Sequence, residues 1–149
     1  MSTVIDSIVI GTDFSETSER ALAYAIELAG RLGARVDVVH AYGLPSFALP
    51  IEGAVMAGAA QVAGLSVRLG EGMKELVDRH RTTAVPLDGH LRVGAPDDEL
   101  LAFAAETGGK LIVVGTHGRT GAAHLLLGSV AERVVRRSTV PVLTVGRQG

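Results

Sequence analysis

The chain of 149 residues contains no cysteine and no tryptophan, and aromatic residues make up only 3% of it. The lack of cysteine excludes disulfide bridges, thiolate metal ligands and a cysteine nucleophile. The scarcity of aromatic side chains argues against a protein that binds single-stranded nucleic acid by stacking. The formal net charge is −2 at pH 7, and no basic stripe is present to attract nucleic-acid phosphates.

Long apolar segments are also missing. No stretch approaches the roughly 20 residues that a membrane-spanning helix needs. Residues 1–6 lack the basic and apolar regions of a signal peptide, so we expect a cytoplasmic protein. The length and the 47% hydrophobic content fit a single domain over residues 1–149 with one core.

Short apolar runs alternate with segments of helical periodicity. The expected strands are residues 7–10, 36–41, 87–93, 111–114 and 140–145. The expected helices are residues 15–32, 59–81, 96–107 and 129–138. Strict alternation of this kind predicts an α/β fold, in which a parallel sheet is covered by helices on both faces through right-handed crossovers.

Local signals predict several element ends. Ser15 suits the N-cap of the first helix and Pro96 the first position of the third. Ser129 and Glu132 have the spacing of a capping box at the start of the last helix. Pro141 favours an edge position for the last strand, because proline has no N–H to donate to a neighbour.

Residues 43–58 are apolar, contain two prolines and show no clear period. An exposed apolar segment of this kind is typical of a surface that binds a partner. The alternative is a lid, or a loop buried on the domain itself. The residues alone leave these interpretations open.

A glycine-spaced segment follows the fourth expected strand, with the pattern Gly115-x2-Gly118-x9-Gly128-Ser129. In open parallel sheets, ligands bind beyond the carboxyl ends of the strands where the strand order reverses. Glycines let backbone N–H groups approach a phosphate, and the helix that begins at Ser129 adds N–H groups and a positive dipole. The alternative is an ordinary glycine-rich loop in which Ser129 is only an N-cap.

The loop after the first expected strand is Gly11-Thr12-Asp13-Phe14-Ser15. The carboxylate of Asp13 would accept hydrogen bonds from ribose hydroxyls or help to hold Mg²⁺. The alternative is that Asp13 or Ser15 only caps the first helix.

Several other phosphate and catalytic motifs are absent. Lysine occurs only at positions 74 and 110, so no P-loop is present, and Arg119 is the one cationic side chain inside the glycine segment. No Gly-x-Gly-x-x-Gly follows the first strand, and no Gly-x-Ser-x-Gly occurs. These absences argue against a dinucleotide site and against a serine hydrolase.

The five histidines contain no His-x3-His pair, so we expect no zinc site. His117 and His124 flank the glycine segment, either as phosphate contacts or as solvated loop residues. His40 ends a strand and is expected to be a hydrogen-bonded structural residue.

The glycine pattern resembles the signature of the ATP-binding branch of the universal stress protein family. The likeness continues in chain order through residues 8–15, 38–41, 94–96 and 138–143. It implies a Rossmann-like three-layer α/β/α fold whose five parallel strands have the order 3-2-1-4-5. In that order the loops after the first and fourth strands lie side by side and would share one ligand.

The resemblance also implies an ATP site. Asp13 would contact the adenosine beside the backbone of Gly11 and Thr12, and Ala41 would touch adenine through its main chain. The ribose and phosphates would lie along Val114, Gly115, Thr116, His117, Gly118, Arg119, Thr120, Gly128, Ser129 and Val130. Two positions depart from the family, because some relatives carry proline at position 11 and many carry valine at position 41.

The expected function is therefore that of an ATP-binding regulatory protein of the stress response, a homodimer paired through its last strands, Val140 to Val145. No well-placed general base or nucleophile is visible, so efficient catalysis is not expected. One alternative is a slow ATPase in which Asp13 or His117 orients a water and Mg²⁺ bridges the phosphates. Another is an interaction module that works without nucleotide through the apolar segment Leu44 to Met56.

Overall fold

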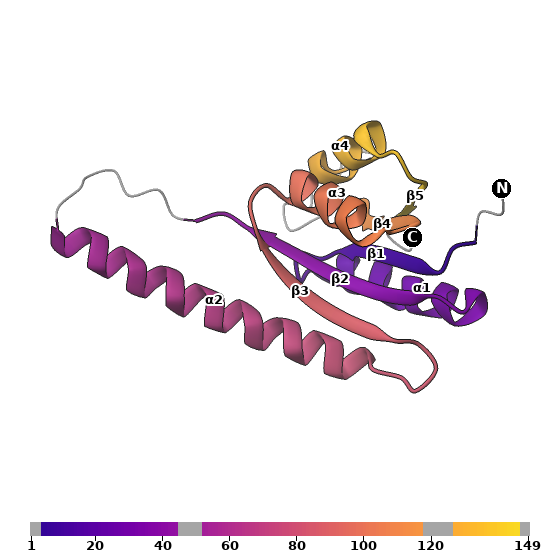
Figure 1. Ribbon diagram of the computed structural model, residues 1–149, viewed down its shortest axis with the longest axis horizontal. Helices are drawn as coiled ribbons and strands as arrows, with labels where there is room; N and C mark the ends of the chain where they lie inside the picture. The colour runs from indigo at the N-terminus through magenta and orange to yellow at the C-terminus, as the bar shows by residue number, and fades with distance from the viewer. Residues whose placement is uncertain (1–3, 45–51, 118–126, 147–149) are drawn as a thin grey trace.

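The computed structural model describes residues 4–44, 52–117 and 127–146. Strands and helices alternate along these ranges (Figure 1). The elements are β1 (Ser7–Gly11), α1 (Glu16–Leu32), β2 (Arg35–Tyr42), α2 (Glu52–His80), β3 (Leu87–Val93), α3 (Pro96–Thr107), β4 (Leu111–Gly115), α4 (Ser129–Arg137) and β5 (Val142–Val145). No helix among the described residues is long and apolar enough to cross a membrane.

The five strands form one parallel sheet in the order β3-β2-β1-β4-β5, which confirms the expected topology. The chain moves outward from β1 to β3 and then returns to the other side of β1 at β4. The strand order therefore reverses between β1 and β4, where Ile10 is paired in register with Val113. Gly11 and Gly115 end these two neighbouring strands at the same edge of the sheet.

Helix α1 begins and ends where local chemistry predicts. The Ser18 N–H donates to the Ser15 hydroxyl at 3.2 Å, so Ser15 is the N-cap, as expected. Gly33 closes the helix at φ +70°, a left-handed conformation that costs glycine little. With the exception of α2 and β5, the elements lie within one residue of their predicted bounds.

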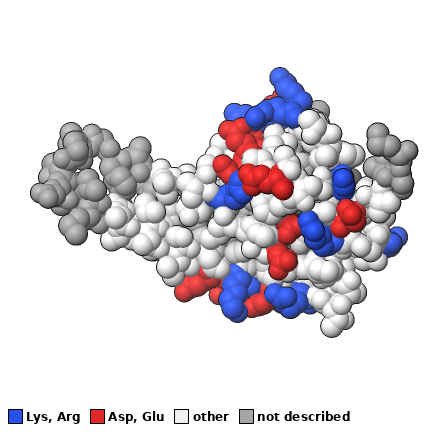
Figure 2. Space-filling model, viewed as in Figure 1, with Lys and Arg blue, Asp and Glu red and all other residues white. Residues whose placement is uncertain are grey.

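Helix α2 begins earlier than predicted, at Glu52 and not at residue 59. Part of the segment predicted to have no period is therefore helical, and residues 45–51 lie outside the described chain. Glycines obscure the helical pattern there, but extending a helix that already exists costs far less than starting one. The first half of α2 extends past the carboxyl ends of β2 and β3 (Figure 1), and its described surface is uncharged (Figure 2).

The capping box at Ser129 is a wrong prediction. Gly128 is the N-cap of α4, and the Glu132 N–H donates to its carbonyl at 2.9 Å. Ser129 is therefore the first helical residue. The Glu132 carboxylate forms an ion pair with Arg136 one turn later and does not reach back to the start of the helix.

The last strand starts at Val142, two residues later than predicted, with Pro141 just before it. The Pro141 carbonyl accepts the Ile112 N–H at 3.0 Å, so proline contributes only its acceptor. The predicted edge position of β5 is confirmed.

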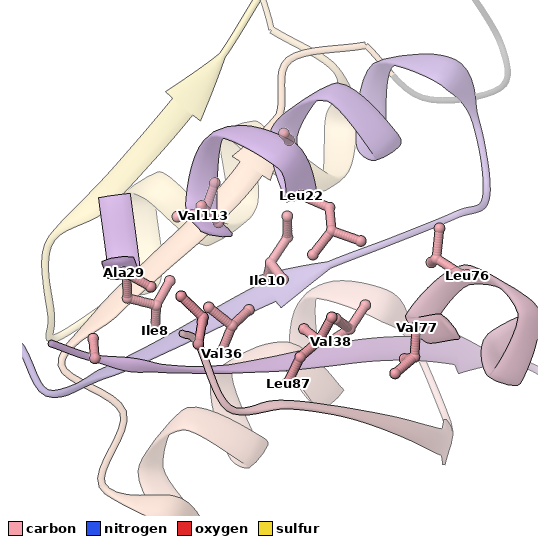
Figure 3. Packing of buried hydrophobic residues seen from close by; sticks show 14 of the residues in the cluster. Ile8, Ile10, Leu22, Ala29, Val36, Val38, Leu76, Val77, Leu87 and Val113 are labelled. Carbon is pink, nitrogen blue, oxygen red and sulfur yellow. The ribbon is translucent and has the colours of Figure 1, made fainter. Parts of the chain in front are cut away.

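Two hydrophobic clusters hold the helices to opposite faces of the sheet. Alternate side chains of a strand point to opposite faces, so Ile8 and Ile10 join α1 and α2, while Val9 joins α3 and α4. Figure 3 shows the first cluster, where Leu22 of α1 and Leu76 of α2 meet the sheet. Burying a side chain of this size stabilises the fold by about 1.5–3 kcal/mol.

Candidate functional site

A cavity of about 300 Å³ lies at the carboxyl edge of the sheet, where the strand order reverses between β1 and β4. This volume is at the lower end of the range for small-molecule sites, about 300–1,000 Å³. Most of the residues singled out from the sequence line it. They are Gly11, Thr12, Asp13, Ala41, Val114, Gly115, His117, Gly128, Ser129 and Val130.

The remaining candidates are not placed in the cavity. Thr116 donates its N–H to the Val145 carbonyl at 3.0 Å, and its hydroxyl is 2.9 Å from Nδ1 of His117. Thr116 is therefore a link between β4 and β5. Gly118, Arg119 and Thr120 lie outside the described residues, as does His124.

Sequence reasoning missed some residues of the wall. They are Ser18, Val39, His40, Pro96, Leu100 and Ala131. Val39 and His40 directly precede the predicted Ala41, so the end of the second strand was itself the signal. Pro96 and Leu100 belong to the first turns of α3, and only the crossing of this helix over β1 brings them to the site.

The loop between β1 and α1 is held in an unusual conformation. Phe14 has φ +63°, a left-handed value that is uncommon outside glycine. The Phe14 N–H donates to the Thr12 hydroxyl at 3.0 Å, and the Ser15 N–H donates to Asp13 Oδ1 at 2.9 Å. These bonds fix the positions of Thr12 and Asp13 at the cavity wall.

His40 supports the same loop from the opposite side of the sheet edge. Its Nδ1 is 2.8 Å from the Thr12 carbonyl oxygen. Because a carbonyl only accepts, Nδ1 carries the hydrogen of this bond. The His40 ring also lies 4.6 Å from the Phe14 ring. His40 is thus the hydrogen-bonded structural residue that its position at the end of a strand predicted.

The two glycines that end β1 and β4 allow helices to approach from opposite faces. A Cβ on Gly11 would stand 3.0 Å from Leu100 Cδ2 of α3. A Cβ on Gly115 would stand 3.0 Å from Thr17 Cγ2 of α1. A Cβ at either position would require the neighbouring Leu100 or Thr17 side chain to shift by a few tenths of an ångström, which would alter the wall of the cavity.

The start of α4 supplies hydrogen-bond donors to the cavity. In an α-helix the first N–H groups have no acceptor within the helix, which leaves those of Ser129, Val130 and Ala131 for a ligand. The Ser129 hydroxyl makes no capping bond. The positive end of the helix dipole adds to this preference for an anion.

Charged side chains hold α3 over the cavity from outside. Arg137 at the end of α4 donates to Asp97 at 2.8 Å and to Asp98 at 2.7 Å. Hydrogen bonding to Asp98 raises the pKa of Arg137. Arg92 of β3 donates to Glu99 at 2.9 Å. Both arginines bind the first turns of the helix that carries Pro96 and Leu100.

The charge of the described cavity wall is low. Asp13, His40 and His117 are its titratable side chains, and none of its described residues is a lysine or arginine. Among the described residues, no group of three histidine, aspartate or glutamate side chains could hold a metal ion. The arrangement suits a ligand bound through backbone N–H groups, a hydroxyl and one carboxylate.

Comparisons with known proteins place this site in context. Residues 5–146 match the model of the Universal stress protein family. Universal stress protein MJ0531 of Methanocaldococcus jannaschii is 35% identical over 140 residues, which cover 93% of this chain and 80% of the relative. The structure of MJ0577 from the same organism has a TM-score of 0.83 at 27% identity and covers 98% of this chain and 99% of its own.

A universal stress protein solved in complex with cAMP has a TM-score of 0.67 at 31% identity, over 97% of this chain and 99% of its own. The family match covers all nine elements of the fold and both loops of the cavity. This chain belongs to the universal stress protein family.

Proposed function

We propose that this chain is an ATP-binding regulatory protein of the stress response, whose nucleotide occupancy alters its conformation or its binding of partners. The observation that carries the proposal is the cavity, which joins the loops after β1 and β4 at the reversal of strand order. The relative solved with cAMP supports an adenine nucleotide as the ligand class.

The chemistry of the wall suggests how a nucleotide would be held. The Asp13 carboxylate would accept hydrogen bonds from ribose hydroxyls, and the main chain at Ala41, also on the cavity wall, would contact the base. The N–H groups of the first turn of α4 and the Ser129 hydroxyl would donate to phosphate oxygens. Asp13 is the only carboxylate on the described wall, so Mg²⁺ would be held mainly by the phosphates themselves.

The same geometry favours binding over catalysis. Asp13 Oδ1 accepts the Ser15 N–H at 2.9 Å, so this oxygen already has a structural role in the loop. A slow ATPase would need Asp13 or His117 to orient a water for attack. Phosphate release from ATP and Mg²⁺ by wild type, absent in Asp13→Asn, would support that alternative and contradict a purely regulatory role.

The proposal includes a homodimer formed through β5. In the described sheet, β5 is an edge strand, and the outer edge of such a strand presents unpaired N–H and C=O groups. Two copies would pair these edges about a two-fold axis. Light scattering at low micromolar concentration that shows only a 15.4 kDa species would contradict this part of the proposal.

The nucleotide is identified by denaturing the purified protein and separating the supernatant on an anion-exchange column. We expect an adenine nucleotide in the supernatant of wild type and less of it from Ser129→Ala. The matched control is Ser66→Ala on α2, which is not among the residues of the cavity wall. The proposal fails if wild type and both variants release no nucleotide, and if the purified protein also binds none after incubation with ATP and Mg²⁺.

A further inference from the structure

The loop that follows β1 has contacts on both faces of the sheet. Thr12 and Asp13 line the cavity. The ring of Phe14, the next residue, is not part of the described cavity wall, and it packs against the first hydrophobic cluster on the face that α1 and α2 cover. The contacts of this loop with the cavity and with the core are therefore separated by a single peptide bond.

The backbone at Phe14 is in a conformation that its side chain disfavours. Its φ of +63° lies in the left-handed region, where a bulky residue is an outlier. Such a conformation persists only where the surrounding contacts determine it, and it is concentrated at ligand sites and switch regions. The hydrogen bond from the Phe14 N–H to the Thr12 hydroxyl, at 3.0 Å, is one of these contacts. The others are made by the ring.

The ring of Phe14 lies beside His40 of β2, with the two ring centres 4.6 Å apart. The same imidazole donates from Nδ1 to the Thr12 carbonyl oxygen at 2.8 Å. One side chain thus holds the cavity side of the loop by a hydrogen bond and the core side by a contact between rings. A displacement of the Phe14 ring would therefore disturb the hydrogen bond that positions Thr12.

Helix α2 approaches the same ring at Gly72. A Cβ on Gly72 would stand 3.9 Å from Phe14 Cε1, so the helix backbone passes close to the edge of the ring. The buried residues of α2 begin directly after this point and belong to the first cluster; they are Met73, Leu76 and Val77. No side chain from residue 59 to residue 72 is buried. Gly72 therefore marks the place where α2 becomes seated on the sheet.

We propose that Phe14 couples nucleotide binding in the cavity to the seating of α2 on the sheet. This inference rests on the proposed function, because it requires a nucleotide in the cavity. A ligand that contacts Thr12 and Asp13 stabilises the loop conformation in which the ring of Phe14 lies beside α2. Coupling between two sites is reciprocal, so displacing the ring from the side of α2 weakens nucleotide binding. Phe14 is thus a positioning residue, and α2 is the element that responds to occupancy of the cavity.

Hydrogen exchange measures the seating of α2 in the full chain. Amide exchange around Gly72 is followed by mass spectrometry, with and without saturating ATP and Mg²⁺. In wild type we expect ATP to slow this exchange by about fivefold, the lower end of typical coupling between two sites. Glycine adopts the left-handed backbone without a ring, so Phe14→Gly should bind ATP more weakly and, at saturation, should lose this response. Stabilisation of the whole fold by bound ATP is common to both proteins, so the difference between them reports the ring.

The reciprocal experiment changes α2 and measures nucleotide binding by calorimetry. Gly72→Val adds branched carbons beside the Phe14 ring, and this overpacking should displace the ring. We expect the affinity for ATP to fall by about fivefold. The matched control is Gly70→Val on the same helix, where an added Cβ would have nothing within 4 Å. Both substitutions place the same residue in α2, and neither position is on the described cavity wall, so the control should bind ATP as wild type does.

The possible results distinguish this inference from the proposed function. If wild type binds no ATP, ADP or AMP, both are contradicted. If wild type binds ATP but the exchange of α2 is unchanged, or is slowed equally in Phe14→Gly, the coupling alone is overturned. The coupling is also overturned if Gly72→Val binds ATP as tightly as wild type, or if Gly70→Val weakens binding by the same factor as Gly72→Val.

Discussion

Leu100 of α3 approaches the end of β1 because Gly11 has no side chain: a Cβ there would stand 3.0 Å from Leu100 Cδ2. Both residues line the cavity. The spacing between α3 and the first loop is thus set by a contact between a glycine and a leucine. Changes at either residue should alter stability and nucleotide binding together.

The first prediction concerns this contact. Gly11→Ala should displace Leu100, lower the free energy of unfolding by about 1 kcal/mol and weaken nucleotide binding, because overpacking shifts the neighbouring side chain. The double variant Gly11→Ala with Leu100→Ala should bind nucleotide more tightly than the sum of the two single-variant effects on the binding free energy predicts, because the two positions are in contact. Urea unfolding and calorimetric titration measure both quantities. Strict additivity would contradict the contact.

The second prediction separates ligand binding from helix capping. Ser129→Ala should leave the free energy of unfolding unchanged, because Gly128 and not Ser129 is the N-cap. It should weaken AMP binding by about tenfold, the loss of one hydrogen bond to a charged group, and leave adenosine binding unchanged. Ser15→Ala is the matched cap variant and should cost about 1 kcal/mol of stability, since Ser15 does cap α1.

The contrast between these serines also shows how far sequence reasoning reaches. Ser15 was predicted correctly because a polar residue preceded a clear apolar stripe. At Ser129 the spacing to Glu132 predicted a capping box, but Gly128 is the N-cap and Ser129 is the first helical residue. The Glu132 carboxylate pairs with Arg136 one turn later, a contact that the capping-box spacing does not reveal.

The third prediction is a pH dependence of stability at the contact between α1 and α2. The hydrogen bond from His80, with Arg79 beside it, lowers the pKa of Glu19 below its ordinary value of 4.5. Because the folded pKa is the lower one, the unfolded chain binds more protons between the two values. The stabilisation is therefore complete above pH 4.5 and is lost as the pH falls through the lowered pKa of Glu19.

Urea unfolding of wild type and Glu19→Gln between pH 7 and pH 3 measures this dependence. Wild type should be the more stable protein at neutral pH, and the difference should shrink on acidification. Glu27→Gln is a matched control, because Glu27 lies on the same helix but pairs with Arg31, one turn away. A difference that grows as the pH falls would contradict the assignment.

The fourth prediction tests the tie between α3 and α4. Asp97 has a side chain only 7% exposed, and its partner Arg137 is 48% exposed. Arg137→Met would leave a buried carboxylate unpaired and should lower the midpoint of thermal unfolding, by less than the loss of a fully buried pair would because solvent screens the arginine. Adding Asp97→Leu should recover part of the lost stability, because it removes the unpaired carboxylate. Thermal unfolding of the two variants measures this coupling, and equal or greater loss in the double variant would count against it.

Elements whose ends are marked by proline or glycine were predictable from the sequence. Elements whose bounds depend on contacts with distant residues were not. Helix α3 begins at Pro96 and ends at Thr107, before Gly108, so both bounds were predicted to the residue. The glycines of α2 concealed its first turns. The strand order followed from the family resemblance and not from periodicity. Leu100 was missed as a wall residue because its place in the cavity depends on the crossover from β3 to β4 over β1.

The central claim is that the cavity between the loops after β1 and β4 binds an adenine nucleotide. Isothermal titration of nucleotide-depleted protein with ATP and Mg²⁺ tests it most directly, with Asp13→Asn as the variant in the wall. We predict saturable binding of one nucleotide per chain, weakened in Asp13→Asn. The absence of binding heat with ATP, ADP and AMP across several temperatures, in protein with a folded circular dichroism spectrum, would contradict the claim.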